Sequence, residues 1–307
     1  MYKRILVPLD GSELAEVVFT YAKELAGRLG LEVVLLHVYN PDEHELAALH
    51  RTYVEHKAEI VKRESQEVQG KIGIRSEGKP LEVRGEVAAG YPAEEILRYA
   101  DENDIDLILM ANRGRSGVRR WPIGSVAEKV LSASNVPVWL VRAGVPEEIT
   151  YDKWPTRTIL VPLDGSELAE AVLPHVEALT KQAGAEMISV VLLKVCEYPI
   201  VPFSPEYASE YRVQKVAEDE ALTVKYLDGV RQRLKNAGVT AQSKILVGKP
   251  AERIIEYVKT NPFSLIVMST HAHSGFSQWV YGSVAAKVLE MAPSPILLVR
   301  PRQADLN

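Results

Sequence analysis

The chain carries the same twelve residues twice, and this repeat constrains its fold more than any other feature. Residues 5–16 read ILVPLDGSELAE, and residues 159–170 repeat them without a change. The offset is 154 residues (159 minus 5), half of the 307-residue chain. Self-similarity at that distance indicates one domain that has been duplicated.

The repeat continues beyond this segment with small shifts in spacing. VVLLHV at 33–38 returns as VVLLKV at 190–195, PAEEI at 92–96 as PAERI at 250–254, and GSVAEKVL at 124–131 as GSVAAKVL at 282–289. The offset grows from 154 to 158 (282 minus 124), so short insertions lie between motifs of the second copy. Each copy has the size of an ordinary domain. We expect one domain at residues 1–143, a linker at 144–157 and a second domain at 158–301.

Composition limits the classes of protein to consider. The chain is 47% hydrophobic and 25% charged, which is typical of soluble globular proteins. Its net charge of −5 argues against nucleic acid or a membrane surface as the main partner. Met1 leads straight into a strand pattern without an apolar signal region, and no run reaches the ~18 apolar residues of a membrane span. The single cysteine, Cys196, excludes an intramolecular disulfide framework and is expected to be buried and inert. We expect a cytoplasmic protein.

Strand and helix patterns alternate in both copies. In the first, buried apolar runs indicate strands at 3–9, 31–39, 81–88, 105–111 and 136–142, and helical spacing indicates helices at 13–30, 93–103 and 125–134, with an exposed polar helix at 44–69. The second has strand patterns at 158–163, 187–195, 240–247, 265–269 and 295–300 and helical patterns at 168–183, 207–236 and 283–291. This alternation predicts two tandem α/β domains, each a mainly parallel five-stranded sheet flanked by helices.

Two strand ends carry residues that suit a ligand site. Ligands of open α/β sheets bind beyond the carboxyl ends of the strands, where the strand order reverses. The first strand of each copy ends at an aspartate, Asp10 or Asp164. The strand at 105–111 opens a long loop that ends at Gly124 and Ser125, and backbone N–H groups at the start of the next helix form a natural phosphate seat.

At these residues the chain resembles the universal stress proteins in a tandem two-domain form, over nearly its whole length. The nucleotide-binding members of that family carry a glycine, two residues, a glycine, nine residues, and then glycine with serine or threonine. The two copies keep this spacing, with Ala111, Gly114, Gly124 and Ser125 in the first and Ser269, Ala272, Gly282 and Ser283 in the second. One glycine is therefore replaced in the first copy and two in the second. The resemblance implies a Rossmann-like fold of the adenine nucleotide alpha hydrolase type.

The resemblance also implies which residues contact an adenine nucleotide. Val38 and Val195 match the adenine-contacting position. The expected site of the first domain consists of Pro8, Asp10, Val38, Met110, Ala111, Arg113, Gly114, Arg115, Gly124, Ser125 and Val126. The expected site of the second domain consists of Pro162, Asp164, Val195, Met268, Ser269, Ala272, Gly282, Ser283 and Val284.

Charge separates the two phosphate loops. Residues 111–120 contain four arginines and no acid (Arg113, Arg115, Arg119 and Arg120), whereas residues 269–278 contain two histidines and neither Lys nor Arg. A triphosphate needs cationic partners, and glycine lets the backbone approach a phosphate closely. The sequence therefore predicts that the first domain binds ATP better than the second. The alternative is that the arginines belong to an ordinary solvent-exposed loop.

Simpler structural roles remain open for several of these residues. A carboxylate repels a triphosphate, so Asp10 would meet the ribose side or share a bound Mg²⁺. Asp10 and Asp164 could each contact the ligand or be only a turn or helix-start residue. Ser125 with Glu128 forms a capping box, and Ser283 would cap alone. His44, His50 and His56 are expected to be solvated. His271 and His273 have no third ligand at a recognisable spacing, so no metal site held by protein alone is predicted.

The leading hypothesis is a stress-response regulator that binds ATP and acts without efficient catalysis. The sequence has no GxxxxGK[ST], HExxH or GxSxG motif. AMP or cAMP would use the same adenine pocket. The alternatives are a nucleotide-independent interaction scaffold and a very slow ATPase. The apolar final strands at 136–142 and 295–300 predict that the two domains pair as an intramolecular pseudo-dimer, as in the family's dimers, and two chains can pair again as a homodimer.

Overall fold

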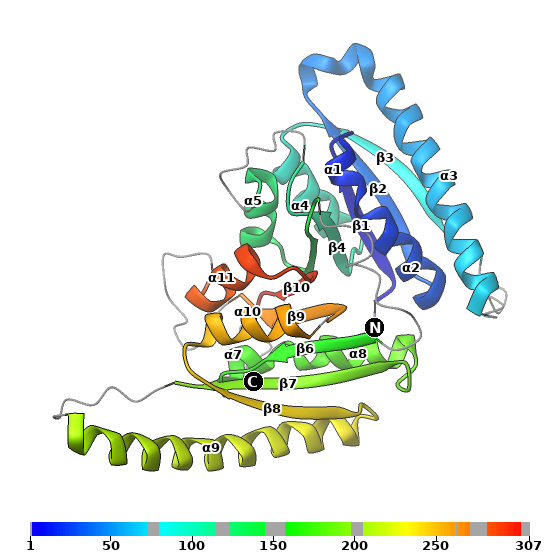
Figure 1. Cartoon of the computed structure of the whole chain (residues 1–307). Coiled ribbons are helices and arrows are strands. Elements are labelled where there is room, and N and C mark those ends of the chain that lie inside the picture. Colours follow the sequence, from blue (N-terminus) through cyan, green and yellow to red (C-terminus); the bar gives the residue numbers. More distant parts are fainter. Residues whose placement is uncertain are drawn as a thin grey trace. The chain divides into compact units, whose positions relative to one another are not determined.

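The computed structural model describes residues 2–72, 80–114, 123–144, 157–197, 205–261, 263–270 and 281–301. The chain divides into two compact units, Met1–Pro146 and Glu147–Asn307. Within these described residues, each unit has five strands and the helices that flank them (Figure 1).

The strand order of the first unit is β3-β2-β1-β4-β5, and its paired strands are parallel, as predicted. In register, Ile5 of the first strand lies opposite Val33 on one side and Leu107 on the other. The chain thus adds strands on one side of β1, then returns to add β4 and β5 on the other, so the strand order reverses at β1. The strands are β1 (Arg4–Leu9), β2 (Glu32–Tyr39), β3 (Val83–Ala89), β4 (Leu107–Ala111) and β5 (Val138–Val141).

The helices of the first unit cover this sheet with apolar faces. Tyr21, Ala22, Leu25 and Ala26 of the second helix are buried, and the helix stops at Gly30, whose φ of 66° is left-handed. Figure 1 shows α3 (Ala47–Ile72), a long helix of this unit, running alongside β2 and β3. The helical elements are α1 (Glu13–Glu16), α2 (Phe19–Leu29), the 3₁₀ helix η1 (Pro41–Leu46), α3 (Ala47–Ile72), α4 (Pro92–Glu102) and α5 (Ser125–Ala133).

The second unit repeats this arrangement, with parallel strands in the order β8-β7-β6-β9-β10. The strands are β6 (Arg157–Pro162), β7 (Ile188–Cys196), β8 (Ala241–Val247), β9 (Leu265–Ser269) and β10 (Ile296–Val299). The helices are α7 (Glu167–Glu170), α8 (Leu173–Ala183), α9 (Pro205–Asn236), α10 (Pro250–Thr260) and α11 (Ser283–Met291).

The predicted continuous helices at 13–30 and 168–183 are wrong, because each is two helices. In the first unit the Val18 N–H bonds to the carbonyl of Ala15 at 3.4 Å, a three-residue step that tightens the chain between α1 and α2. In the second unit Pro174 has no N–H to give to the carbonyl four residues back, and α8 begins at Leu173, beside this proline.

The description of residues 44–69 as an exposed helix also needs correction. One face of α3 is buried, through Val54, Ala58, Val61, Ser65 and Val68. These residues follow helical spacing and pack on α2 and the sheet. The polar composition of the segment reflects its other face.

A glutamate joins the first short helix to the long helix in both units. Glu16 accepts hydrogen bonds from the Tyr53 hydroxyl at 2.9 Å and from the Lys57 ammonium at 2.7 Å. In the second unit Glu170, at the repeated position, is paired with Arg233 and faces Tyr226. Tyr53 and Tyr226 therefore occupy equivalent positions on α3 and α9.

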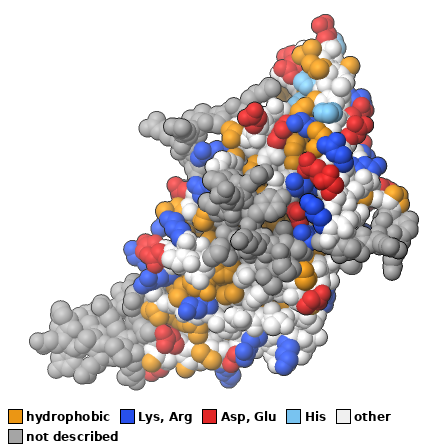
Figure 2. Space-filling view, turned by 45° about the vertical axis from the view of Figure 1, so that its right-hand side comes forward, with side chains coloured by type: hydrophobic (Ala, Val, Ile, Leu, Met, Phe, Trp, Pro, Cys, Tyr) orange, Lys and Arg blue, Asp and Glu red, His pale blue; other side chains and the backbone are white. Residues whose placement is uncertain are grey.

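Charged side chains of both signs are interspersed over the visible face of the described residues (Figure 2). The helices of the described ranges include none that combines the length and the apolar character of a membrane span.

A close approach between α2 and α3 gives a test of the packing in the first unit. A Cβ on Gly27 would lie 2.7 Å from the Ser65 carbonyl oxygen and 2.8 Å from the Val68 Cβ, whereas a Cβ on Gly70 meets nothing within 4 Å. We expect Gly27→Ala to destabilise the protein by about 1–3 kcal/mol through overpacking. Gly70→Ala, the matched control in α3, is expected to stabilise by up to about 1 kcal/mol through helix propensity. Urea denaturation of the two full-length variants checks this, and equal effects of the two changes would contradict it.

Candidate functional site

The candidate site of each unit lies where the strand order reverses, at the carboxyl end of the first strand. In the first unit this edge gathers the turn after β1, the end of β4 and the start of α5. The second unit gathers the turn after β6, the end of β9 and the start of α11 in the same way. This is the location expected for ligands of open α/β sheets.

The aspartate after the first strand holds the turn into the first helix. Asp10 Oδ1 accepts hydrogen bonds from the Ser12 N–H at 3.0 Å and the Ser12 hydroxyl at 2.6 Å, and Ser12 caps α1 by accepting from the Ala15 N–H. Asp164 and Ser166 make the same bonds, at 2.9 and 2.6 Å. One carboxylate oxygen of each aspartate therefore holds the serine that caps the first helix.

The other oxygen of Asp10 lies against the phosphate loop. A Cβ placed on Gly114 would be 2.0 Å from Asp10 Oδ2, so only glycine fits at this position without a shift. The glycine that the sequence pattern singles out thus has a structural role in addition to any contact with a ligand.

Two hydrogen bonds close the base of the long loop in each unit. The Asn112 N–H donates to the Val141 carbonyl and the Gly124 N–H donates to the Asn112 carbonyl, both at 2.8 Å. In the second unit the Thr270 N–H donates to Val299 at 2.9 Å and the Gly282 N–H to Thr270 at 2.8 Å. The start of α5 or α11 is therefore fixed beside the end of β4 or β9.

The predicted capping by serine is wrong in both units. The N-cap residues are Gly124 and Gly282, and Ser125 and Ser283 are the first helical residues, with no side-chain cap on either helix. The closed loop sets where the helix begins, because it holds Gly124, the N-cap of α5, in extended backbone with φ near −74°. No side chain at the N-cap thus competes with an anion for the first N–H groups of these helices.

The first unit encloses a small cavity of 120 Å³ at this position. Every residue predicted for the first site lines it except Arg115, which lies outside the described residues, as do Arg119 and Arg120. The sequence did not single out the other lining residues, which are Leu9, Ala15, Leu36, Pro92, Ile96, Asn112 and Ala127. Most are apolar and resemble ordinary core residues, so the sequence holds little signal for them.

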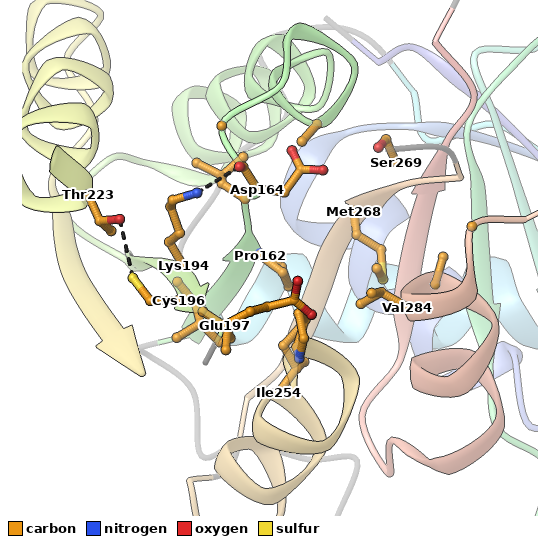
Figure 3. A pocket seen from close by; sticks show the side chains of 18 of the residues that line it. Pro162, Asp164, Lys194, Cys196, Glu197, Thr223, Ile254, Met268, Ser269 and Val284 are labelled. Atoms are coloured by element: carbon orange, nitrogen blue, oxygen red, sulfur yellow. Dashed lines mark hydrogen bonds between the residues drawn. The ribbon is translucent and has the colours of Figure 1, made fainter. Parts of the chain in front are cut away.

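The second unit has a much larger cavity, of 860 Å³ (Figure 3). The predicted residues line it except Ala272, which lies outside the described residues together with His271 and His273. The cavity also reaches residues that the sequence reading missed, among them Lys194, Cys196, Glu197, Asp219, Thr223, Tyr226 and Ile254. They come from the end of β7, from α9 and from α10.

Aromatic side chains account for the difference between the two cavities. In the first unit the His50 ring stacks on His37 at 4.7 Å and on Tyr39 at 5.1 Å between ring centroids, which fills the space between β2 and α3. The prediction that His50 is solvated is therefore wrong. The equivalent residues of the second unit are Lys194, Cys196 and Thr223, and the last two bond at 3.3 Å from Sγ to Oγ1. Cys196 and Thr223 are smaller than Tyr39 and His50, and the second cavity reaches them.

Lys194 is held at the edge of this cavity by the backbone. Its ammonium donates to the Asp164 carbonyl at 2.7 Å and lies 5.7 Å from the centre of the Tyr226 ring (Figure 3). Burial raises the pKa of the Tyr226 phenol above its ordinary value, and Glu170 raises this pKa further. Tyr226 is therefore neutral at physiological pH.

Cys196 is a buried free thiol, as predicted. In the part of the chain that the structure describes, no group of three or more His, Cys, Asp or Glu side chains is arranged to hold a metal ion.

Comparison with known proteins identifies the family. The model of the universal stress protein family matches residues 1–142 and again residues 155–300. A universal stress protein of Methanocaldococcus jannaschii is 32% identical over 157 residues, covering 46% of this chain and 96% of that protein. Another, from Mycolicibacterium smegmatis, is 23% identical over 302 residues and 97% of both chains.

A solved structure shows the same fold over the whole chain. The universal stress protein from Archaeoglobus fulgidus matches with a TM-score of 0.62 at 23% identity, covering 97% of this chain and 98% of that one. Together with the two matches to the family model, this places one Rossmann-like domain in each half. The chain belongs to the universal stress protein family and carries two of its domains in tandem.

Proposed function

We propose that this protein is a stress-response regulator that binds an adenine nucleotide, ATP in particular, in its first domain. The observation that carries the proposal is the side chain of Arg113 beside α5. Its Nε is buried and has no hydrogen-bond partner among the described residues. A buried donor without a partner is costly, and a phosphate oxygen would satisfy it.

The cavity of the first domain suits the base of such a ligand. Its walls include Pro8, Val38, Met110 and Val126, which present apolar surface. Its volume of 120 Å³ is below the range of about 300–1,000 Å³ that is usual for sites enclosing a whole drug-sized ligand. In our proposal the cavity takes the base, and the ribose and phosphates extend along the loop toward α5.

The start of α5 supports a phosphate at the end of that path. Its N-cap is Gly124, so the first N–H groups face the site without a capping side chain. The sequence adds Arg115, Arg119 and Arg120 to the loop. Asp10 keeps one oxygen in the Ser12 turn, and its other oxygen can share a Mg²⁺ that the phosphates bring with them.

The proposed preference of ATP for the first domain rests on the charge of its loop and not on the volume of its cavity. The cavity of the second domain is larger, but the sequence of its loop from 269 to 278 has no Lys or Arg. A triphosphate gains little from space that offers no counter-charge. Bound ATP would then act as the signal that changes the stability or the partners of the protein.

Removing the Arg113 guanidinium tests the phosphate contact. We expect Arg113→Gln to weaken ATP binding about 10- to 100-fold, the equivalent of one charge-assisted hydrogen bond, and to leave adenosine binding unchanged. Arg98→Gln is the matched control, because Arg98 is an exposed arginine of the same domain that pairs with Glu95 and Glu102. Isothermal titration calorimetry measures both. If wild-type protein bound no ATP at millimolar concentration and its melting temperature did not change, a nucleotide-independent scaffold would be favoured instead.

The two loop glycines give a second test, because their surroundings differ. Gly114→Ala places a Cβ 2.0 Å from Asp10 Oδ2, and we expect it to destabilise the protein by about 1–3 kcal/mol, with a smaller loss when the change is made in an Asp10→Ala background. Gly124→Ala meets nothing closer than 3.4 Å. It should leave the melting temperature unchanged and lower ATP affinity, since the methyl group stands where the phosphate approaches. Thermal unfolding with and without ATP separates the two effects, and an ATP affinity unchanged in Gly124→Ala would argue against a phosphate at α5.

A further inference from the structure

The long helix of the second domain has an open groove along one flank. Figure 1 shows α9 lying along β7 and β8, on which it packs. The groove has a volume of 490 Å³, and apart from Glu170 of α7 its lining comes from α9, namely Leu222, Lys225, Tyr226, Gly229, Val230 and Arg233. These six residues recur at three- and four-residue spacings, so they lie along one side of the helix. Leu222 is 66% exposed, which is unusual for a leucine inside a helix of a folded domain.

A glycine opens the middle of this groove. Gly229 lies well inside the 32 residues of α9, where glycine lowers helix stability relative to alanine. A Cβ at Gly229 would meet none of the described residues within 4 Å, so packing within the domain does not require a glycine there. A helix surface without a side chain lets another backbone approach closely. Gly229 therefore suits contact with a helix from outside the chain.

The charges of α9 are divided between its two halves. Residues 205–220 contain two basic and five acidic residues, a net charge of −3, and residues 221–236 contain four basic and one acidic, a net charge of +3. Two copies of this helix that run antiparallel bring each acidic half against a basic half. Parallel copies would bring like charges together. The helix is therefore complementary in charge to a second, antiparallel copy of itself.

The exposed leucine and the glycine define one antiparallel register. Leu222 precedes Lys225 by three residues, and Gly229 follows Tyr226 by three. A two-fold axis between Lys225 and Tyr226 therefore places Leu222 of each copy on Gly229 of the other. In the same register the Lys225 ammonium of each copy faces the Tyr226 ring of the other, and aromatic rings attract cations.

The same axis brings opposite charges together at the two ends of the contact. Glu218 precedes Lys225 by seven residues, and Arg233 follows Tyr226 by seven. Glu218 of each copy therefore meets Arg233 of the other, and both side chains are exposed. The Arg233 guanidinium donates to Glu170 within the domain and has further N–H groups for a second carboxylate.

The equivalent helix of the first domain has only part of this arrangement. Counted from the equivalent tyrosines Tyr53 and Tyr226, α3 also carries an exposed leucine, Leu49. At the position of the glycine, however, α3 has His56. An imidazole there holds a second helix away, so the close approach is specific to α9.

We propose that two copies of this chain associate through antiparallel α9 helices, with Leu222 of each copy packed on Gly229 of the other. This interface is separate from the nucleotide site and does not depend on it. The contact from Glu218 to Arg233 spans 16 residues of each helix, which is about 24 Å. Contacts of this length are at the small end of specific interfaces, so we expect a dissociation constant in the micromolar range.

Sedimentation equilibrium of the full chain, from about 1 to 200 μM, measures the association. We expect a reversible monomer–dimer equilibrium for the wild type. Gly229→Gln fills the contact and should weaken the dimer at least about tenfold without lowering the melting temperature, because glutamine favours a helix more than glycine does. Gly70→Gln is the matched control, since it makes the same change in α3 at a glycine whose Cβ also meets nothing within 4 Å. It should leave the dissociation constant unchanged.

Engineered cysteines test the register. In the proposed pair, position 222 of one copy lies beside position 229 of the other, whereas the two positions 222 are seven residues, or about 10 Å, apart along the helix. A disulfide needs Cα atoms within about 7 Å. The double variant Leu222→Cys with Gly229→Cys should therefore form covalent dimers on mild oxidation, and either single change should not. Non-reducing electrophoresis measures this, and the wild type with its buried Cys196 gives the baseline.

Three outcomes would overturn the inference. One is a wild-type chain that stays monomeric at about 200 μM. Another is a dimer that Gly229→Gln leaves as tight as before, which would assign the association to another surface such as a sheet edge. The third is a single cysteine variant that crosslinks as readily as the double variant, because this excludes the antiparallel register. None of these measurements involves ATP, so failure of the nucleotide proposal would leave them unaffected.

Discussion

The pairing of β1 with β2 on one side and β4 on the other is the constraint on which each domain depends. Ile5 is hydrogen-bonded into both ladders, opposite Val33 and Leu107. Because all three strands are parallel, their carboxyl ends meet at one edge. Sheet geometry brings the Asp10 turn and the end of β4 together there, and the hydrogen bond of the Gly124 N–H to the Asn112 carbonyl adds the start of α5. The second domain obtains the same edge from β6, β7 and β9.

Most of the fold could be predicted because local pattern and global structure agree. Apolar runs such as residues 105–111 are buried on both faces, and Gly30 ends a helix in the left-handed conformation that its residue type favours. The breaks between α1 and α2 and between α7 and α8 could not be predicted from apolar periodicity, because the apolar residues keep helical spacing across each break. Val17–Val18 keeps helical dihedral angles and differs only in which carbonyl its N–H groups reach.

The candidate site was predictable where it follows the backbone and not where it follows side chains from distant elements. All described residues of the two predicted sets line a cavity, since they lie at strand ends and helix starts. The N-cap shifted from Ser125 to Gly124 because the loop closes on the Asn112 carbonyl, a contact that residue preferences do not encode. The stack of His37, Tyr39 and His50 joins a strand to a helix. Its sequence signals were the exchanges of His37 for Lys194 and of Tyr39 for Cys196 at the end of an otherwise repeated segment.

The contact of Glu16 with Tyr53 and Lys57 has a mechanical consequence. Glu16 ends the short helix that begins at the Ser12 cap, and Ser12 is held by Asp10 at the mouth of the cavity. The single turn α1 therefore connects the edge of the cavity to α3, with Glu16 at its far end. A shift of the Asp10 turn would therefore strain the contact of Glu16 with Tyr53 and Lys57 on α3. The second domain has the same connection, from Asp164 through Glu170 to α9, so in each domain the turn beside the cavity is tied to the long helix through one glutamate.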